Sequence, residues 1–145
     1  MITKQLHLDC IIRMYDLITH GQANLAIIME RFGISLNQYL DNFEKRILPL
    51  NQFFSLAISL VKVLGSVHEK RIVHKNIGPS NILIDPETSE LRLIDFASSS
   101  ELSREHQDTF SLSKRIEGYL PYVSPEQTGR INRDIDFRTD YYSLG

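Results

Sequence analysis

The chain has 145 residues, of which 42% are hydrophobic and 23% charged, as is ordinary for a globular domain. Its net charge of −2 supplies no basic surface, so nucleic acid is not expected as the main partner. The single Cys10 excludes an internal disulfide, and neither a signal-peptide core nor an apolar run of ~18 residues is present. A cytoplasmic chain with no membrane span is therefore predicted.

The first predicted elements are two strands, residues 11–19 and 25–30, which are rich in Ile, Met and Leu. The polar residues 20–24 between them predict a hairpin turn. A short helix is expected over residues 36–40, with the hydroxyl of Ser35 as its N-cap.

Residues 51–70 predict the clearest helix of the chain, with Asn51 as its N-cap. Apolar side chains cover most of its circumference, which is typical of a helix buried in a core. His68 is expected to be structural, because the histidines are scattered and no cysteine pair is available to complete a zinc site.

Residues 82–84 and 91–94 predict a small hairpin across the polar turn 85–90. Asn81 precedes the first strand and Asp95 follows the second, so both side chains are expected at the open end of the hairpin. An amide oxygen and a carboxylate are hard ligands of the kind that Mg²⁺ prefers.

Three sequence patterns follow one another in an informative order. Residues 72–97 read IVHKNIGPSNILI and then LRLIDFA, residues 118–126 read GYLPYVSPE, and residues 140–145 read DYYSLG. These resemble, in turn, the H-R-D-L-x-x-x-N and D-F-G loops, the A-P-E end of the activation segment and the D-x-W-S-L-G helix start of protein kinases. By these motifs the chain is identified as a member of the protein kinase superfamily.

The resemblance implies an α+β fold, the central portion of the two-lobed protein kinase fold. Residues 1–29 would be the remnant of the β N-lobe, 30–34 the hinge, and 35–145 an incomplete, mainly helical C-lobe. A complete kinase domain has about 250 residues or more, at the large end of single-domain sizes. The chain contains no Gly-rich loop and no V-A-I-K lysine, so it is expected to be the middle of such a domain.

The resemblance also implies that the complete domain binds ATP. Met29 would be the gatekeeper, Glu30 would offer a backbone carbonyl to adenine, and Phe32 would offer a carbonyl and an N–H. Leu83 would form the floor of the adenine pocket.

The loops that would carry the chemistry match the kinase pattern only in part. Asn81 and Asp95 are implied as the ligands of Mg²⁺, and His74 matches the motif histidine. Asn76, however, replaces the catalytic Asp, and Gly78 replaces the Lys that stabilises the transferring phosphate in many Ser/Thr kinases. These two changes favour weak or absent catalysis.

Residues 98–117 match an activation loop, although a solvated loop rich in Ser and Thr fits the same composition. Lys75 replaces the motif Arg that clamps phosphate, and lysine lacks the bidentate fork of arginine. Ala97 replaces the Gly of D-F-G, which restricts the backbone there. Tyr119 stands where Ser/Thr kinases often have Thr, so the substrate class is left open.

Residues 70–145 resemble more narrowly the N-terminal Ser/Thr kinase-like domain of large bacterial hybrid sensor proteins. This resemblance is found in the sequences of residues 123–133, 74–77 and 102–105. Such proteins continue with an ATPase-like region, a sensor region and a histidine kinase. A signalling role is implied, with a protein substrate or these fused regions as partners.

Three functional hypotheses remain. The parent domain is a Ser/Thr protein kinase that is active when complete, or a pseudokinase that acts as a nucleotide-binding or scaffolding switch, or the chain is a non-functional truncated gene product. Asn76 and Gly78 favour the pseudokinase for the parent domain. The missing N-lobe elements favour the truncated product for this polypeptide alone.

Overall fold

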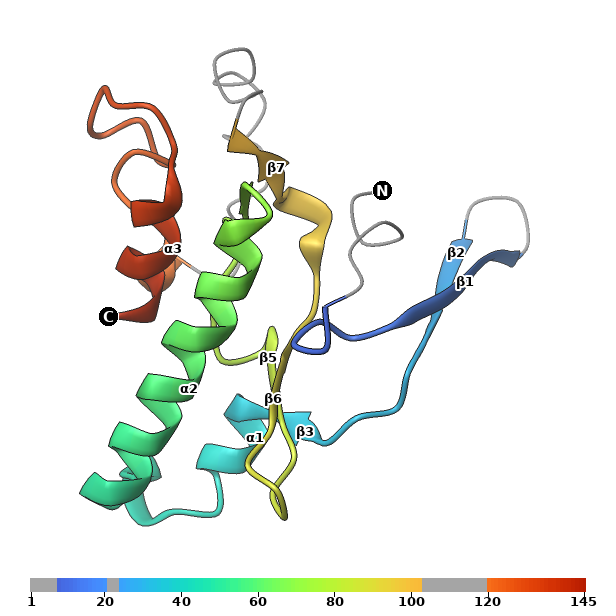
Figure 1. Cartoon of the computed structure of the whole chain (residues 1–145), viewed down its shortest axis with the longest axis vertical. Helices are drawn as coiled ribbons and strands as arrows, with labels where there is room; N and C mark the ends of the chain where they lie inside the picture. Colours follow the sequence, from blue (N-terminus) through green and yellow to red (C-terminus); the bar gives the residue numbers. More distant parts are fainter. Residues whose placement is uncertain (1–7, 21–23, 103–119) are drawn as a thin grey trace.

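The computed structural model describes residues 8–20, 24–102 and 120–145, which form three small antiparallel sheets and a long helix (Figure 1). The predicted turn 20–24 and loop 98–117 fall partly outside the described residues, and Tyr119 falls outside them altogether.

An antiparallel hairpin of β1 (Met14–His20) and β2 (Asn24–Met29) extends away from the rest of the chain (Figure 1). The predicted hairpin is thus confirmed, but its first strand begins later than residue 11. Residues 10–12 bond to a different partner, because the Ile12 N–H donates to the Leu93 carbonyl (3.0 Å) and the Leu93 N–H donates to the Cys10 carbonyl (2.8 Å). The residues predicted as one strand therefore pair with two different sheets.

The central sheet contains β3 (Ile34–Ser35), β5 (Ile82–Ile84) and β6 (Leu91–Leu93) in the order β3-β5-β6. The predicted hairpin β5–β6 is present, and its turn is closed by the Asp85 N–H, which donates to the Glu90 carbonyl (2.9 Å). Gly33 enters this sheet with a φ of +40°, and a Cβ at this position would collide with the carbonyl of Ile84. Glycine is therefore required where the chain passes from β2 to β3.

Two short helices follow strand β3 in the chain. Helix α1 (Leu36–Leu40) is capped as predicted, because the Gln38 N–H donates to the Ser35 hydroxyl (3.2 Å) and the Gln38 side chain accepts from the Ser35 N–H (3.1 Å). The 3₁₀ helix η2 (Glu44–Arg46) leads into the long helix.

Helix α2 (Leu50–Glu69) packs against the strands with one face only. The prediction that Asn51 caps it is wrong, because the helix already begins at Leu50 and Asn51 lies in its first turn. The expectation of burial nearly all round is also wrong for the described residues, since Phe54 and Ile58 are more than half exposed. The buried face joins one core cluster, composed of Ile11, Leu36, Leu60, Leu64, Val67, Ile72, Ile77, Ile82, Ile84, Leu91, Leu93 and Phe96.

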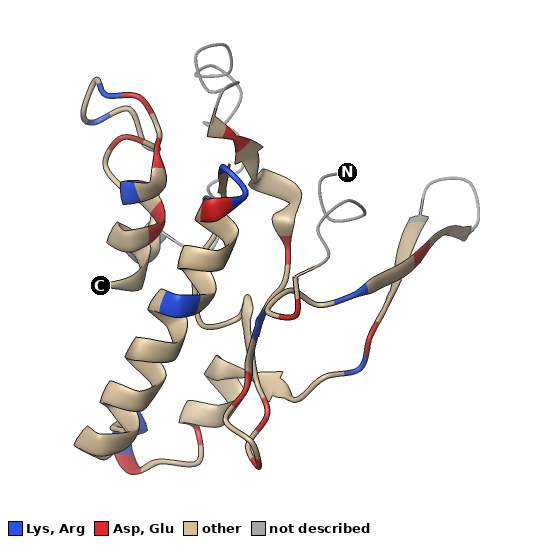
Figure 2. Ribbon diagram, in the orientation of Figure 1, with Lys and Arg blue, Asp and Glu red and all other residues tan. Residues whose placement is uncertain are grey.

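Helix α2 carries few charged residues along its length, as Figure 2 shows. By length and composition this helix could cross a membrane, although 22% of its apolar segment is buried against the rest of the chain. A helix from a protein core has the same length and composition, so the feature alone places α2 in neither setting. The predicted absence of a membrane span stays a prediction.

The remaining elements surround the end of α2. Strand β4 (Ile72–Val73) pairs with β7 (Ser100–Glu101), and the 3₁₀ helix η3 (Phe96–Ser98) connects β6 to β7. The 3₁₀ helix η6 (Leu120–Tyr122) precedes helix α3 (Phe137–Leu144), which lies beside α2 (Figure 1).

Candidate functional site

Asn76, Asn81 and Asp95 form one hydrogen-bonded group at the open end of the β5–β6 hairpin. The Asn76 Nδ2 donates to the Asp95 Oδ2 (2.9 Å), and the Asn81 Nδ2 donates to the Asn76 carbonyl (2.9 Å). The Ile94 N–H donates to the Asn81 carbonyl (3.0 Å), which joins the two ends of the hairpin. Since the Asn81 amide nitrogen is used in this way, its amide oxygen is the atom that remains for a cation.

Asp95 has a left-handed backbone, with a φ of 62°, and its side chain accepts a hydrogen bond from the Ala97 N–H (3.4 Å). The carboxylate is exposed, whereas the next residue, Phe96, is buried against the ring of His74 with centroids 4.4 Å apart. Left-handed residues other than glycine persist only where their surroundings determine them. Here a buried aromatic anchors the loop and leaves the carboxylate free to face solvent.

His74 is fully buried and has a fixed tautomer. Its Nε2 donates to the Ile94 carbonyl (3.0 Å), and its Nδ1 accepts from the Asn76 N–H (3.2 Å). Burial lowers the pKa of His74 and outweighs the attraction of the Asp140 carboxylate, so the imidazole is neutral at pH 7. His74 therefore positions Asn76 and is not available as an acid or base.

Asp140, in the first turn of α3, holds the backbone of the loop that begins at His74. Its buried carboxylate accepts from the backbone N–H groups of His74 and Lys75 and from the His68 Nε2, each at 2.8 Å. His68 also stacks on Phe137, with centroids 4.6 Å apart. The structural role predicted for His68 fits this geometry, whereas the function of Asp140 was missed, although the DYYSLG motif contains it.

An apolar cavity of about 170 Å³ separates the β1–β2 hairpin from the Asp95 loop; its lining consists of Ile12, Met14, Ile27, Met29, Ile94, Asp95, Phe96 and Ala97. Met29 and Asp95 thus border one space. Leu83, Glu30 and Phe32 are not part of this lining. Ligand pockets for whole small molecules measure about 300–1,000 Å³, so this cavity holds part of a nucleotide at most.

The predicted hinge is fastened from outside the cavity by Arg92. The guanidinium forms an ion pair with Glu30 and lies 4.2 Å above the centroid of the Phe32 ring. Burial would raise the pKa of Glu30, but hydrogen bonds from Arg92 and from the Arg13 N–H outweigh it and lower that pKa. Leu83 is the cross-strand partner of Arg92, so the two side chains share one face of the sheet.

A metal ion fits this site only together with other ligands. Within residues 8–20, 24–102 and 120–145, no group of three or more His, Cys, Asp and Glu side chains could hold a metal. Asp95 and Asn81 supply one carboxylate and one amide. Mg²⁺ is commonly bound by one or two carboxylates together with waters and substrate phosphates, so these residues fit Mg²⁺ that arrives on a nucleotide.

Gly78 lies in the turn between Asn76 and Asn81, where its carbonyl accepts from the Asn81 N–H (2.9 Å). It contributes no side chain to the site. A cation at this point, such as the Lys that the kinase pattern has here, would add a charge-assisted contact to a phosphate. Its absence leaves Lys75 as the nearest basic residue in the sequence of this loop.

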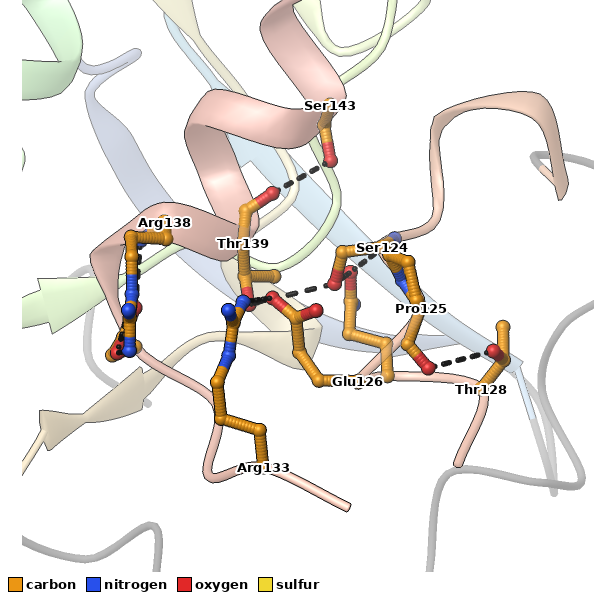
Figure 3. Close-up of polar contacts among 10 residues, drawn as sticks. Ser124, Pro125, Glu126, Thr128, Arg133, Arg138, Thr139 and Ser143 are labelled. Atoms are coloured by element: carbon orange, nitrogen blue, oxygen red, sulfur yellow. Dashed lines mark hydrogen bonds and ion pairs between the residues drawn. The ribbon is translucent and has the colours of Figure 1, made fainter. Parts of the chain in front are cut away.

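Residues 124–126, called here the Ser-Pro-Glu segment, are anchored on α3 through side-chain contacts (Figure 3). The Glu126 Oε1 accepts from the Thr139 hydroxyl (2.8 Å) and from the Arg133 Nη2 (2.9 Å). Burial alone would raise the pKa of Glu126, but the contacts from Thr139 and Arg133 lower it. One turn further, the Ser143 hydroxyl donates to the Tyr122 carbonyl (2.6 Å).

The whole chain, residues 1–145, matches the family model of the protein kinase domain. The chain belongs to the protein kinase family. It is 27% identical to a probable serine/threonine-protein kinase of Clostridium acetobutylicum over 93% of this chain, and 28% identical to one of Clostridium perfringens, also over 93%. It is 31% identical to the Citron Rho-interacting kinase of Mus musculus over 84% of this chain, or 6% of that protein.

The chain spans 19% and 18% of the two clostridial relatives, so it corresponds to about a fifth of their length. The α+β structure described above is therefore a part of the kinase fold. Asn76, Asn81 and Asp95 come together in it, with Met29 bordering the adjacent cavity. Arg92 and Gln127, which contact the site from other segments, were missed because no local pattern marks them.

Proposed function

We propose that this chain is the central part of a Ser/Thr-type protein kinase domain that binds ATP with Mg²⁺ and transfers phosphate only weakly. The hydrogen bond from Asn76 to Asp95 carries this proposal. The side chain at the catalytic-base position is a neutral amide, and it donates its proton to the predicted metal ligand. It can neither accept a proton from a substrate hydroxyl nor add negative charge beside the metal.

The remaining chemistry depends on positioning. A general base contributes ~10²–10⁴-fold, while the loose transition state of phosphoryl transfer depends chiefly on alignment and on the charge of the metal. The Asn76 amide oxygen can still orient a substrate hydroxyl. His74 holds Asn76 in place, and bound Mg²⁺ would neutralise the charge that develops on the phosphates. Greatly reduced transfer with retained nucleotide binding is therefore the expected behaviour.

The adenine would be bound by the backbone of residues 30–34, with Met29 at the back of the cavity and Leu83 below. We assign residues 1–29 to the N-lobe, 30–34 to the hinge and 35–145 to the C-lobe. The contacts of Arg92 with Glu30 and Phe32 support this hinge, because they fix both of its side chains to β6.

A pseudokinase that works as a switch or scaffold is the second candidate. The observation that favours it is again the pairing of Asn76 with Asp95, which occupies a metal-ligand oxygen with a hydrogen-bond donor. Cytoplasmic signalling is proposed in either case, with a protein substrate or fused ATPase-like, sensor and histidine kinase regions as partners. These partners and the location are supported only by the sequence resemblance.

Titration calorimetry with ATP and Mg²⁺ tests the proposed site. We expect weak binding by this chain, with a Kd above ~100 μM, because the charge-assisted phosphate contacts of a Gly-rich loop and its lysine are absent. Asp95→Ala should abolish the Mg²⁺-dependent part. Glu87→Ala, which removes a carboxylate from the exposed β5–β6 turn, should leave binding unchanged. Micromolar binding that Asp95→Ala does not affect would place the nucleotide elsewhere.

A further inference from the structure

The carboxamide of Gln127 connects the Ser-Pro-Glu segment to the predicted catalytic loop. Its Nε2 donates to the Lys75 carbonyl (2.8 Å), which lies 52 residues away in the sequence. Its Oε1 accepts from the N–H (3.2 Å) and the hydroxyl (3.1 Å) of Ser124. Ser124 is fully buried and Gln127 nearly so, so the contacts between them are shielded from water, and the contact with Lys75 is partly buried.

The orientation of this carboxamide is fixed by its partners. A backbone N–H can only donate and a carbonyl can only accept, so the oxygen must face Ser124 and the nitrogen must face Lys75. The exchanged orientation would deprive both the Ser124 N–H and the Lys75 carbonyl of this partner. Both ends of the side chain are therefore matched to particular backbone groups in two distant segments.

Lys75 has an unusual conformation that needs such support. Its φ of 66° lies in the left-handed region, where a residue with a side chain is strained. Its N–H is held by Asp140 (2.8 Å) and its carbonyl by Gln127 (2.8 Å). The next residue is Asn76, whose side chain reaches Asp95, so the direction of Asn76 depends on the conformation of Lys75.

Both supports converge on the start of α3. Asp140 is the neighbour in sequence of Thr139, and Thr139 binds Glu126, which directly precedes Gln127 (Figure 3). The N–H and the carbonyl of Lys75 are thus held by two branches of one buried network. A shift of the Ser-Pro-Glu segment relative to α3 would be transmitted to the carbonyl side alone.

We propose that Gln127 is a positioning residue, which holds Lys75 in its left-handed conformation and thereby directs Asn76 toward Asp95. It couples the end of the activation segment to the metal-binding loop through one uncharged side chain. Because neither partner is charged, the coupling needs no phosphate group. The inference deepens the proposed function, because the group that Gln127 positions is the predicted nucleotide and Mg²⁺ site.

The test compares Gln127→Glu with the wild-type chain in the absence of nucleotide, at pH 8 and at pH 5. The carboxylate can still accept from Ser124, but it repels the Lys75 carbonyl. A protonated carboxyl can donate to that carbonyl again, and burial beside a carbonyl raises the pKa of such a group. We expect amide hydrogen exchange in residues 74–77 to accelerate at least tenfold at pH 8 and to approach the wild-type rate at pH 5.

Two further variants complete the experiment. Gln127→Met keeps the volume but has no donor, so the Asn76 side-chain amide resonances should shift at both pH values without recovery. Gln52→Glu makes the same chemical change as Gln127→Glu on the exposed surface of α2 and should leave the exchange in residues 74–77 unchanged.

Wild-type exchange and wild-type Asn76 resonances in folded Gln127→Met would overturn the proposal. Loss of the far-UV circular dichroism of the fold in both Gln127 variants would also overturn it, because Gln127 would then be a residue of the folding core. The readout needs no nucleotide. If the chain does not bind ATP but the exchange rates change as expected, the proposed function is wrong and this inference still holds.

Discussion

The Nδ2 of Asn76 donates to the Oδ2 of Asp95 across 2.9 Å. In the kinase pattern the first position is a carboxylate that receives a proton and the second a carboxylate that binds metal. Here the first position is an uncharged amide that donates a hydrogen bond to the second. If the proposed roles hold, Asn76 in place of Asp alters both the proton transfer and the charge beside the metal.

Restoring the carboxylate should increase catalysis in a complete domain. We expect Asn76→Asp, introduced into a reconstructed domain with a Gly-rich loop and its lysine, to raise phosphoryl transfer at least ~100-fold, within the range of a general base. Radiolabelled phosphate transfer to a generic protein substrate measures it.

Ordinary turnover of about 1–100 s⁻¹ with Asn76 in place would contradict the proposal of weak transfer. Transfer by neither form would indicate that Gly78 limits the reaction or that the domain is a scaffold. Asn76→Ala is the matched control, since it removes the hydrogen bond without adding a charge.

The free energy of unfolding should fall as the pH is lowered from 7 to 5, because His74 is buried in its neutral form. Burial lowers the pKa of His74 below the ordinary value of about 6.5, so in this range the unfolded chain binds a proton that the folded chain excludes. One such proton changes the free energy by at most about 1.4 kcal/mol per pH unit. Urea denaturation at several pH values measures the slope.

His74→Gln should flatten this slope, because glutamine does not titrate. Carboxylates such as Glu126, whose pKa is lowered on folding, lose their contribution at lower pH and do not account for a change above pH 5. Equal slopes for His74→Gln and the wild-type chain would show that another group is responsible.

Glu126→Gln should destabilise the chain by about 1–3 kcal/mol, the usual value of a hydrogen bond to a charged group together with the cost of leaving it imperfectly paired. Arg133→Gln should cost less than about 1 kcal/mol, because the Arg133 side chain is 40% exposed and such ion pairs are weak. Urea denaturation compares the two, with Glu87→Gln in an exposed turn as the control. Equal losses would mean that the ion pair, and not the Thr139 hydroxyl, dominates.

The isolated chain should associate through α2. Phe54, Ile58 and Val61 form an exposed apolar stripe at helical spacing, and uncovered patches of this kind drive association. Sedimentation velocity at several concentrations should show oligomers that the double variant Phe54→Lys and Ile58→Lys reduces. Gln52→Lys adds charge outside the stripe and should have little effect. A compact monomer with one cooperative melt in the wild-type chain would contradict this prediction.

The features that the sequence alone predicts are formed by residues that are close together in the chain. The N-cap at Ser35, the turn of the β5–β6 hairpin and the three kinase motifs are all local patterns that neighbouring residues predict. The kinase fold follows from these motifs because their order fixes where each loop lies in the chain. The meeting of Asn81 and Asp95 also follows, since one hairpin joins them.

Contacts between distant segments were decided only by the tertiary structure. Gln127 and Lys75 are 52 residues apart, and Asp140 and His74 are 66 apart, so no periodicity or motif spacing reveals that they bond. The apolar run at residues 11–19 predicts one strand, yet its first residues bond to β6 and residues 14–19 pair with β2. Likewise, the composition of α2 predicts a core helix, but burial depends on which neighbours cover it. Local sequence specifies what an element can do, and only packing specifies which partner receives its hydrogen bonds and its apolar surface.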